Sequence, residues 1–191
     1  NGWDFCRAVQ LRANALPTSG AIYNAQHQRL CRAGCRRVET MCHILQACPT
    51  THDARIRRHN DIVAKVAKHT RKMGWTTDIE PRIYHQTARR TFVPDLVVHK
   101  DTQNIVICDV QVSWEGERSL AEAWDAKRAY YDNNLFREAA SRKWPGRRLT
   151  FTPLLVGARG TWPAANMLTV ESIQLPIHLQ RSCVERVMMC D

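Results

Sequence analysis

The feature that most constrains the fold is a pair of apolar segments, each of which carries one acidic residue. They form TFVPDLVVHKDTQNIVICDVQVSW, residues 91–114. Asp95 follows Pro94 near the start of the first segment, and Asp109 interrupts an apolar run at residues 105–112 of the second. Burial of a carboxylate is costly unless a partner compensates it. The pattern predicts a β-hairpin with its turn at residues 100–103, and a specific task for the buried acid.

Helical and strand patterns surround this hairpin. Apolar residues at helical spacing predict a helix over residues 51–73, with Thr51 as its N-cap and Gly74 at its end. Other patterns predict a short helix at 7–16, an edge strand at 79–84, a helix of about 25 residues that ends before Pro145, a strand at 148–156, and helical structure from about residue 164, interrupted at Pro176. This order predicts an α/β fold with a mixed sheet flanked by helices.

Half of the eight cysteines gather with a histidine in one short segment, CRAGCRRVETMCHILQAC. The spacing Cys31-x3-Cys35-x7-His43-x4-Cys48 suits tetrahedral coordination of zinc, with Gly34 easing the bend between the first two thiolates. Because the protein fills all four positions, such a site is structural. We therefore expect a small CCHC zinc knuckle in front of the α/β fold.

Other assignments of this cluster remain open. Cys42 competes with His43 for the third ligand position, and His52 is a weaker substitute. Cysteines that bind no metal are a further alternative. One dense Cys/His cluster beside scattered thiols is nevertheless typical of a metal site in a reducing compartment.

The chain is strongly basic. Its 28 Lys and Arg residues outnumber 18 Asp and Glu residues, which gives a formal net charge of +10. Such an excess favours nucleic acid as a partner, although a basic protein with no such partner is an alternative. The sequence contains no run of 18 apolar residues, so we expect no membrane span. The N-terminal residues lack an initiator methionine and a signal-peptide pattern, from which we expect a piece of a longer chain.

The predicted hairpin brings Asp95 and Asp109 toward each other. Two carboxylates at close range repel unless a divalent cation lies between them, and Mg²⁺ prefers such oxygen ligands. Lys127 lies on the following helix and shares a face with Trp124 and Tyr131, so it can return to the same site. Its ammonium could stabilise the charge that develops on a phosphodiester during hydrolysis. The alternative is an arginine paired with Asp109, and a Lys127 that faces solvent.

These motifs resemble those of the PD-(D/E)xK nucleases, which share the restriction-endonuclease-like fold. In that pattern a lysine follows two residues after the second acid; here Gln111 occupies the position, and Lys127 is the expected replacement. The chain as a whole resembles the C-terminal part of a site-specific non-LTR retrotransposon protein with a restriction-like endonuclease. The resemblance lies in the zinc knuckle and in the segments LRANALPTSG, HILQACPTTHDARIRRHN, VPDL and ICDVQV. The resemblance is to elements that insert into large-subunit ribosomal RNA genes.

The resemblance implies a role for each motif. Zinc would be bound by Cys31, Cys35, His43 and Cys48, Mg²⁺ or Mn²⁺ would be held by Asp95 and Asp109, and cleavage would be assisted by Lys127 and Tyr130. The chain would comprise a lead-in from an upstream polymerase region (1–28), the knuckle (29–50) and the endonuclease domain (51–191). The implied activity, in the nucleus, is nicking of double-stranded target DNA, with ribosomal DNA expected. The freed 3′-hydroxyl would prime reverse transcription of the element RNA by another domain of the same polypeptide.

Polar residues beside these motifs are the expected nucleic-acid contacts: Arg36, Arg37, Arg57, Arg58, His59, Asn60, Arg89 and Arg90. Arg58-His59-Asn60 matches a short motif of the family, but His59 also lies on the apolar stripe of its helix, where a packed core histidine is an alternative. The family often has a basic residue before Pro-Asp. Val93 stands there, and Arg89 and Arg90 are its expected substitutes.

A different class of function fits the same residues. The chain could be a zinc-dependent nucleic-acid-binding module whose nuclease fold is catalytically inactive. Such a protein would bind DNA or RNA with strong salt dependence but would cut neither. Metal-dependent nicking of a plasmid separates the two hypotheses.

Overall fold

A four-stranded mixed sheet forms the centre of the computed structural model, which describes residues 2–21, 29–115 and 120–189. The strand order is β1-β4-β5-β6. The strands are β1 (Thr76–Ile79), β4 (Leu96–His99), β5 (Asn104–Ser113) and β6 (Arg148–Gly157). β1, β4 and β5 pair antiparallel, whereas β5 and β6 pair parallel. The prediction of an α/β fold with a mixed sheet is confirmed.

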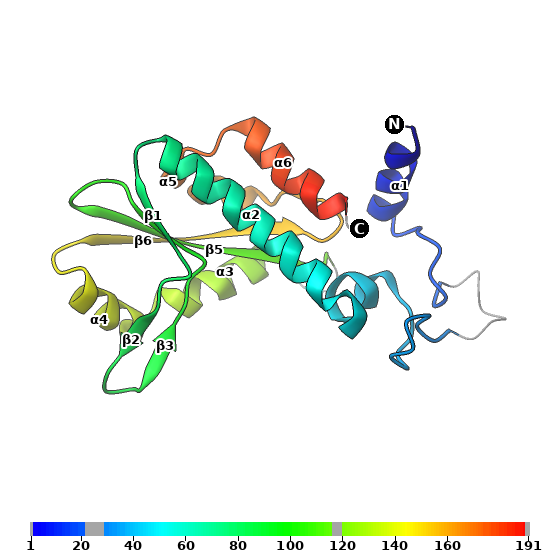
Figure 1. Cartoon of the computed structure of the whole chain (residues 1–191), viewed down its shortest axis with the longest axis horizontal. Coiled ribbons are helices and arrows are strands. Elements are labelled where there is room, and N and C mark those ends of the chain that lie inside the picture. The colour runs from blue at the N-terminus through cyan, green and yellow to red at the C-terminus, as the bar shows by residue number, and fades with distance from the viewer. Residues whose placement is uncertain (1, 22–28, 116–119, 190–191) are drawn as a thin grey trace.

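Helices cover both faces of this sheet (Figure 1). One face is covered by α2 (His52–Lys72), α5 (Met167–Ile173), which follows the 3₁₀ turn Ala164–Asn166, and α6 (Ile177–Met188). The other face is covered by α3 (Leu120–Tyr131), α4 (Asn134–Lys143) and a separate hairpin of β2 (Ile83–His85) and β3 (Arg90–Phe92). Within the described ranges, no helix has the length and hydrophobicity needed to cross a bilayer.

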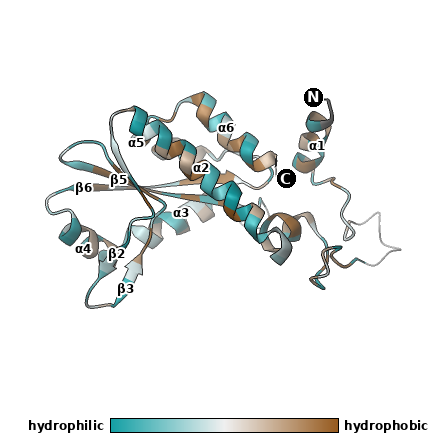
Figure 2. Ribbon diagram, in the orientation of Figure 1, coloured by the Kyte–Doolittle hydropathy of each residue, from teal (hydrophilic) through white to brown (hydrophobic). Residues whose placement is uncertain are grey.

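Alternation along β5 separates two hydrophobic cores. Val106, Cys108 and Val110 pack with α2 on one face, while Ile105 and Ile107 pack with α4 on the other. Successive strand residues point to opposite faces, so a strand buried on both faces is apolar throughout. Figure 2 shows hydrophobic colour along the strands, and both hydrophilic and hydrophobic residues along α2, as expected of a helix with one buried stripe.

Two predicted elements are each divided in two. The first strand of the predicted hairpin is interrupted around Pro94, which has no N–H to donate to a ladder. As a result β3 pairs with β2, and β4 joins the main sheet. The predicted long helix ends at Tyr131 and restarts as α4, where the side chain of Asn133 caps the new helix by accepting a hydrogen bond from the N–H of Phe136 at 2.9 Å.

The knuckle and the N-terminal segment pack on one end of the α/β fold. Leu30 and Val38 form an isolated bridge, and the segment continues through a π-helical turn (His43–Ala47) and a 3₁₀ turn (Pro49–Thr51) into α2. Leu11, in α1 (Gly2–Arg12), packs with Met41 and Leu45 of the knuckle. Arg12 donates to Oγ1 of Thr161 at 2.9 Å. The N-terminal segment therefore contacts both parts, and the predicted domain boundaries remain predictions.

Candidate active site and metal centre

The two predicted acids meet where β4 begins. Leu96 pairs with Cys108, so one more step of the same antiparallel register sets Asp95 opposite Asp109. The N–H of Asp95 donates to Oδ1 of Asp109 at 3.3 Å, and the N–H of Val110 donates to Oδ2 of Asp95 at 2.6 Å. The strand is interrupted at Pro94, so the N–H of Asp95 donates to the second acid, while its carbonyl accepts from the N–H of Glu80 at 2.9 Å.

Lys127 reaches the same point from α3. Its Nζ lies 2.6 Å from Oδ2 of Asp109. Trp124 fixes the helix by donating from Nε1 to the carbonyl of Pro153 at 2.8 Å, and Tyr131 donates from its hydroxyl to the carbonyl of Val93 at 3.1 Å. These anchors stand three residues before and four residues after Lys127, on one helix face. The structure therefore brings the lysine to the acids, while its chemical role remains a prediction.

The charges in this site are strongly coupled. The Asp109 side chain is 6% exposed, and its burial raises the pKa of its carboxyl; the nearby charge of Asp95 adds to this rise, and Lys127 opposes it. Lys127 keeps 31% of its side chain exposed, so its ammonium can respond to a substrate. A second positive charge, such as a metal ion, would relieve the remaining repulsion between the carboxylates.

The carboxylate oxygens fit a divalent cation. In the described chain both hydrogen bonds to the Asp95 carboxylate fall on Oδ2, which leaves Oδ1 for a metal ion. Asp109 offers Oδ2, which now lies beside the ammonium of Lys127. Mg²⁺ is usually bound by one or two carboxylates together with waters and substrate phosphate oxygens, so two aspartates suffice as the protein ligands.

His59, on α2, also belongs to this site. Its Nε2 lies 3.1 Å from Oδ2 of Asp95 and 3.2 Å from the carbonyl oxygen of Val110. The hydrogen bond with Asp95 raises the pKa of His59 to about 9, although partial burial opposes the rise. His59 is therefore a charged partner of the first acid rather than a packed core histidine. Its i+3 and i+7 neighbours, Ile62 and Val66, are fully buried, and this spacing was the available sequence signal for an inward-facing residue.

Tyr131 lies nearer the acids than the predicted Tyr130. Burial raises the pKa of the Tyr131 phenol, and the negative charge of Asp109, with which it can share a hydrogen bond, raises it further. Tyr130 is 45% exposed and contacts the rings of Phe92 and Tyr131 edge-on, with centroid distances of 6.1 and 4.9 Å. Tyr130 therefore borders the site from outside. The supporting role predicted for Tyr130 remains a prediction.

The predicted zinc ligands form one compact cluster. The donor atoms of Cys31, Cys35, His43 and Cys48 all lie within 4.8 Å of one another. Sγ of Cys31 and Sγ of Cys48 are 3.9 Å apart, close to the roughly 3.8 Å edge of a tetrahedron with zinc–sulfur bonds of about 2.3 Å. Gly34 turns the chain with a φ of +76°, as predicted. This Cys₃His set can hold a zinc ion, and it contains His43 rather than Cys42 or His52.

Glu39 fixes the loop that carries these ligands. It is 2% exposed and accepts hydrogen bonds from the N–H groups of Ser19 and Arg32, at 3.0 and 2.7 Å. Burial opposes ionisation of the Glu39 carboxyl, but these bonds and the Arg32 guanidinium outweigh it and lower its pKa to about 2. The loop is thus held by a charged group in addition to any metal.

Replacing Glu39 with glutamine should loosen the knuckle, because the amide keeps the shape but loses the charge. We expect Glu39→Gln to reduce the free energy of unfolding of the zinc-loaded chain by about 2 kcal/mol, as charge-assisted hydrogen bonds are lost. Urea denaturation measures this change. Glu185→Gln, at an exposed position of α6, is the control and should leave the free energy unchanged. Equal stability of Glu39→Gln and the parent chain would contradict the assignment.

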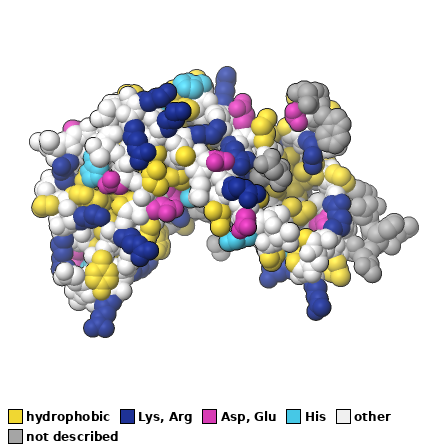
Figure 3. All heavy atoms as spheres, viewed as in Figure 1, with side chains coloured by type: hydrophobic (Ala, Val, Ile, Leu, Met, Phe, Trp, Pro, Cys, Tyr) yellow, Lys and Arg dark blue, Asp and Glu magenta, His cyan; other side chains and the backbone are white. Residues whose placement is uncertain are grey.

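The residues that we expected to contact nucleic acid differ in their exposure to solvent. Arg36, Arg37, Arg57, Asn60, Arg89 and Arg90 are exposed. Arg90 lies over the rings of Phe92 and Tyr130, at 4.6 and 5.0 Å. Figure 3 shows Lys and Arg side chains spread over the visible face, including α2 and the tip of the β2–β3 hairpin, without a single dense patch.

The expected surface position of Arg58 is wrong. Arg58 is 2% exposed, and its Nη2 donates to the carbonyl of Leu45 at 3.3 Å. Arg55, one turn earlier, donates to the carbonyls of Gln46 and Cys48. The π-helical turn and the residue after it leave carbonyl groups without regular helical partners. The arginines in the first turns of α2 donate to these carbonyl groups. Arg58 joins the knuckle to α2 instead of facing a phosphate.

Comparison with known proteins gives a consistent set of relatives. No family model matches the chain. It is 55% identical over 186 residues, 96% of its length, to the "Retrovirus-related Pol polyprotein from type-1 retrotransposable element R2" of Popillia japonica, and 52% identical over 187 residues to a second such protein. It is 30% identical over 164 residues to the corresponding polyprotein from the type-2 retrotransposable element R2DM of Drosophila melanogaster. The chain covers 30%, 42% and 15% of these relatives, respectively. Its homologues are thus R2 non-LTR retrotransposon Pol polyproteins, of which it spans less than half.

Proposed function

We propose that this chain is the endonuclease-bearing part of an R2-type retrotransposon polyprotein, and that it nicks double-stranded target DNA. The similarity to Pol polyproteins supports the first half of the proposal. One observation carries the second half: Asp95 just before β4, Asp109 on β5 and Lys127 on α3 converge, with the lysine 2.6 Å from Asp109. Two carboxylates that can hold a divalent cation, with a lysine beside them, can support metal-dependent hydrolysis of a phosphodiester.

Each side chain has a distinct task in this proposal. Asp95 and Asp109 would hold Mg²⁺ or Mn²⁺, which would supply polarisation of the phosphodiester and activation of a water molecule. Lys127 places its ammonium against the negative charge that develops on the phosphate oxygens. His59 holds Oδ2 of Asp95 and thereby fixes the orientation of a carboxylate that would bind the cation. Attack of water on phosphorus displaces the 3′ oxygen, which leaves as a hydroxyl.

The proposal extends to the parent protein. The 3′-hydroxyl at the nick would prime reverse transcription of the element RNA by a polymerase domain of the same polypeptide, in the nucleus and with ribosomal DNA as the target. The net charge of +10 supports a nucleic-acid partner. The exposed arginines, without Arg58, are proposed to contact phosphates. The zinc-loaded knuckle would hold the start of α2, and thereby His59, in place.

Nicking of supercoiled plasmid tests the endonuclease proposal. The chain should convert supercoiled plasmid to the open circle in Mn²⁺ or Mg²⁺, but not in a buffer without divalent cations. A DNA polymerase should then extend the nick with labelled nucleotides, because cleavage leaves a 3′-hydroxyl. Salt-dependent binding without any cutting would instead support the rival hypothesis of an inactive nuclease fold that only binds nucleic acid.

His59 provides a second prediction on the same site. His59→Ala should reduce the nicking rate about 10- to 100-fold, the usual effect of removing a group that orients a metal ligand. The nicking rate of His59→Gln should fall by a smaller factor, because the glutamine amide can still donate to Asp95. Nicking rates measured as a function of Mn²⁺ concentration test this expectation. His99→Gln is the matched control, since His99 also pairs with an aspartate, Asp78, at 3.1 Å, but away from the acids.

The same pair predicts a pH dependence of stability. The pKa of His59 is about 9 in the folded chain, against 6.5 for an ordinary histidine. Its stabilising contribution is therefore fully present below pH 6.5 and is lost as the pH rises through 9. Without divalent cations, the difference in unfolding free energy between the parent and His59→Gln should shrink over this interval. A constant difference would show that the pair does not form.

A further inference from the structure

A row of polar residues continues from the acidic site along β5. Asp109, Gln111 and Ser113 alternate with Val110 and Val112, which pack into the core under α2. The earlier residues on the same side of the strand, Ile105 and Ile107, are buried against α4. From Asp109 onward this side thus changes from apolar to polar, although α3 lies across it. Burial of polar groups costs free energy, so this part of the strand favours contact with water or a ligand over close packing against α3.

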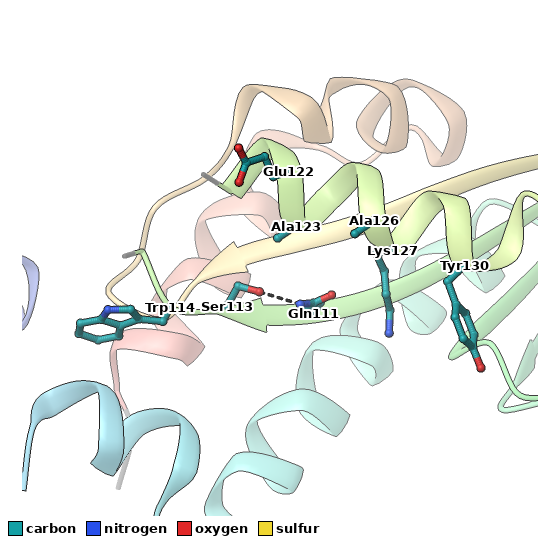
Figure 4. A pocket seen from close by; sticks show the side chains of 8 residues that line it. All are labelled: Gln111, Ser113, Trp114, Glu122, Ala123, Ala126, Lys127 and Tyr130. Atoms are coloured by element: carbon teal, nitrogen blue, oxygen red, sulfur yellow. Dashed lines mark hydrogen bonds between the residues drawn. The ribbon is translucent and has the colours of Figure 1, made fainter. Parts of the chain in front are cut away.

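A cavity of about 660 Å³ lies there (Figure 4). Gln111 and Ser113 form its floor, and the small side chains of Ala123 and Ala126, one turn apart on α3, leave its roof open. Trp114 and Tyr130 lie at opposite ends, and Lys127 points down between helix and strand. Glu122 also borders the cavity, but its carboxylate is turned away from Gln111 and Lys127 in this view.

The chemistry of this lining suits a nucleotide. The amide of Gln111 donates from Nε2 to Oγ of Ser113 at 2.7 Å, which orients both polar groups toward the cavity. An amide and a hydroxyl offer donors and acceptors to the edge of a base. Aromatic rings such as Trp114 and Tyr130 stack on bases of any sequence. Lys127 lies at the side shared with the acids, where the phosphate of the same strand would be held.

The size of the cavity indicates which form of DNA can enter it. A volume of about 660 Å³ lies within the range of about 300–1,000 Å³ typical of small-ligand sites. The volume can take a base with its sugar. Because α3 lies above the cavity and β5 below it, a base that is paired in a duplex would have to leave its stack to enter. We propose that the cavity receives one unpaired nucleotide of the cleaved strand, next to the scissile phosphate. This proposal rests on the proposed nuclease function and names the form of DNA that the site prefers.

Binding to two matched probes tests the proposal. One probe is a mixed-sequence DNA duplex that contains a single unpaired 2-aminopurine, and the other is the same duplex with that base paired. Both are titrated in Ca²⁺, so that binding is measured without depending on cleavage. The chain should bind the unpaired probe roughly tenfold more tightly, the size expected from stacking one base on aromatic side chains. Its 2-aminopurine emission should fall as the base stacks.

Two substitutions on α3 provide the comparison. Ala126 lines the cavity at an exposed helical position, so Ala126→Leu fills the space with a good helix former. Ala129→Leu, also exposed on α3 but outside the lining, is the control. Ala126→Leu should remove the preference for the unpaired probe and leave binding to the paired probe within about twofold of the parent. Ala129→Leu should keep the preference.

The outcomes are distinct from those of the nicking assay. Equal affinity of the parent chain for both probes would overturn the cavity proposal, even if the chain nicks plasmid. A preference that survives in Ala126→Leu would overturn it as well. A preference that Ala126→Leu removes supports it, and it does so even in a chain that nicks nothing, in which case only the nuclease proposal fails.

Discussion

Replacing Asp109 with asparagine should abolish nicking and, at the same time, make the fold more stable. The amide would keep the shape of the side chain but lose the charge that binds a cation and positions Lys127, 2.6 Å away. We expect the nicking rate to fall by about 10³-fold or more, because both metal binding and charge stabilisation depend on this carboxylate. Plasmid nicking in Mn²⁺, followed over a long time course, measures the loss.

The expected gain in stability follows from the sign of the pKa change. Burial and the charge of Asp95 raise the pKa of Asp109 above its unfolded value. Between these two pKa values the folded chain binds more protons than the unfolded chain, so stability falls as the pH rises through that interval. The penalty reaches its full size once the pH exceeds the pKa of Asp109 in the folded chain. Asp109→Asn removes this penalty and should raise the free energy of unfolding, as is common where activity needs a charge that the fold disfavours.

Asp125→Asn is the matched control for both measurements. Asp125 is exposed on α3, two residues from Lys127, so its replacement removes the same charge from the surface. The variant should keep the parental nicking rate and nearly the parental stability. Nicking by Asp109→Asn at the parental rate would show that cleavage comes from another site or from a contaminating nuclease. A large loss of stability in Asp109→Asn would show instead that Asp109 serves the fold.

The meeting of the acids could be predicted because it depends on local rules alone. The turn at residues 100–103 is fixed by Asp101, whose Oδ1 accepts hydrogen bonds from the N–H groups of Gln103 and Asn104, both at 2.7 Å. A turn at that position sets the register of β4 and β5, and the register sets Asp95 opposite Asp109. The apolar run around Asp109 then indicates that this acid is buried.

Other parts of the site depend on tertiary packing that no local pattern records. Tyr131, rather than Tyr130, lies near the acids because α3 ends there and turns, with Asn133 capping the next helix. Helical periodicity places both tyrosines near Lys127, and only the angle at which α3 crosses β5 distinguishes them. His59 lies 36 residues before Asp95 along the chain, so its contact depends on how α2 packs on the sheet.

The burial of Arg58 shows that charge patterns along the sequence do not record tertiary packing either. A run of basic residues on a helix indicates a solvated or phosphate-binding face. Arg58 is inaccessible because the π-helical turn before α2 presents carbonyl groups that need donors. Such a turn has no recognisable sequence pattern apart from the metal ligands around it. The position of Arg58 therefore follows from the knuckle, and it could be predicted only after the ligand geometry was known.

Replacing Cys48 with serine should remove bound zinc and unfold the knuckle while leaving the sheet intact. Cys48 is 1% exposed, and its Sγ belongs to the four-donor cluster. Structural zinc contributes about 10–16 kcal/mol to the folding of small zinc-binding peptides, so a lost ligand cannot be offset by the few apolar contacts of this segment. Zinc content by elemental analysis should fall from about one ion per chain to nearly none. Amide hydrogen exchange should become fast for residues 30–51 and stay slow in β4, β5 and β6.

Cys42→Ser is the control that identifies the ligand set, because Cys42 stands beside His43 but outside the donor cluster. The Cys42→Ser variant should retain its zinc, and its amide hydrogen exchange in the knuckle should remain slow. Loss of zinc from Cys42→Ser together with retention of zinc by Cys48→Ser would contradict the assignment. The exchange pattern of Cys48→Ser also tests the link to the acids. Arg55 and Arg58 bind carbonyls of the turn that ends at Cys48, so its unfolding should loosen the first turns of α2. His59 lies at the edge of that region, and nicking by Cys48→Ser should therefore fall toward the level of His59→Ala even though Asp95 and Asp109 remain in place.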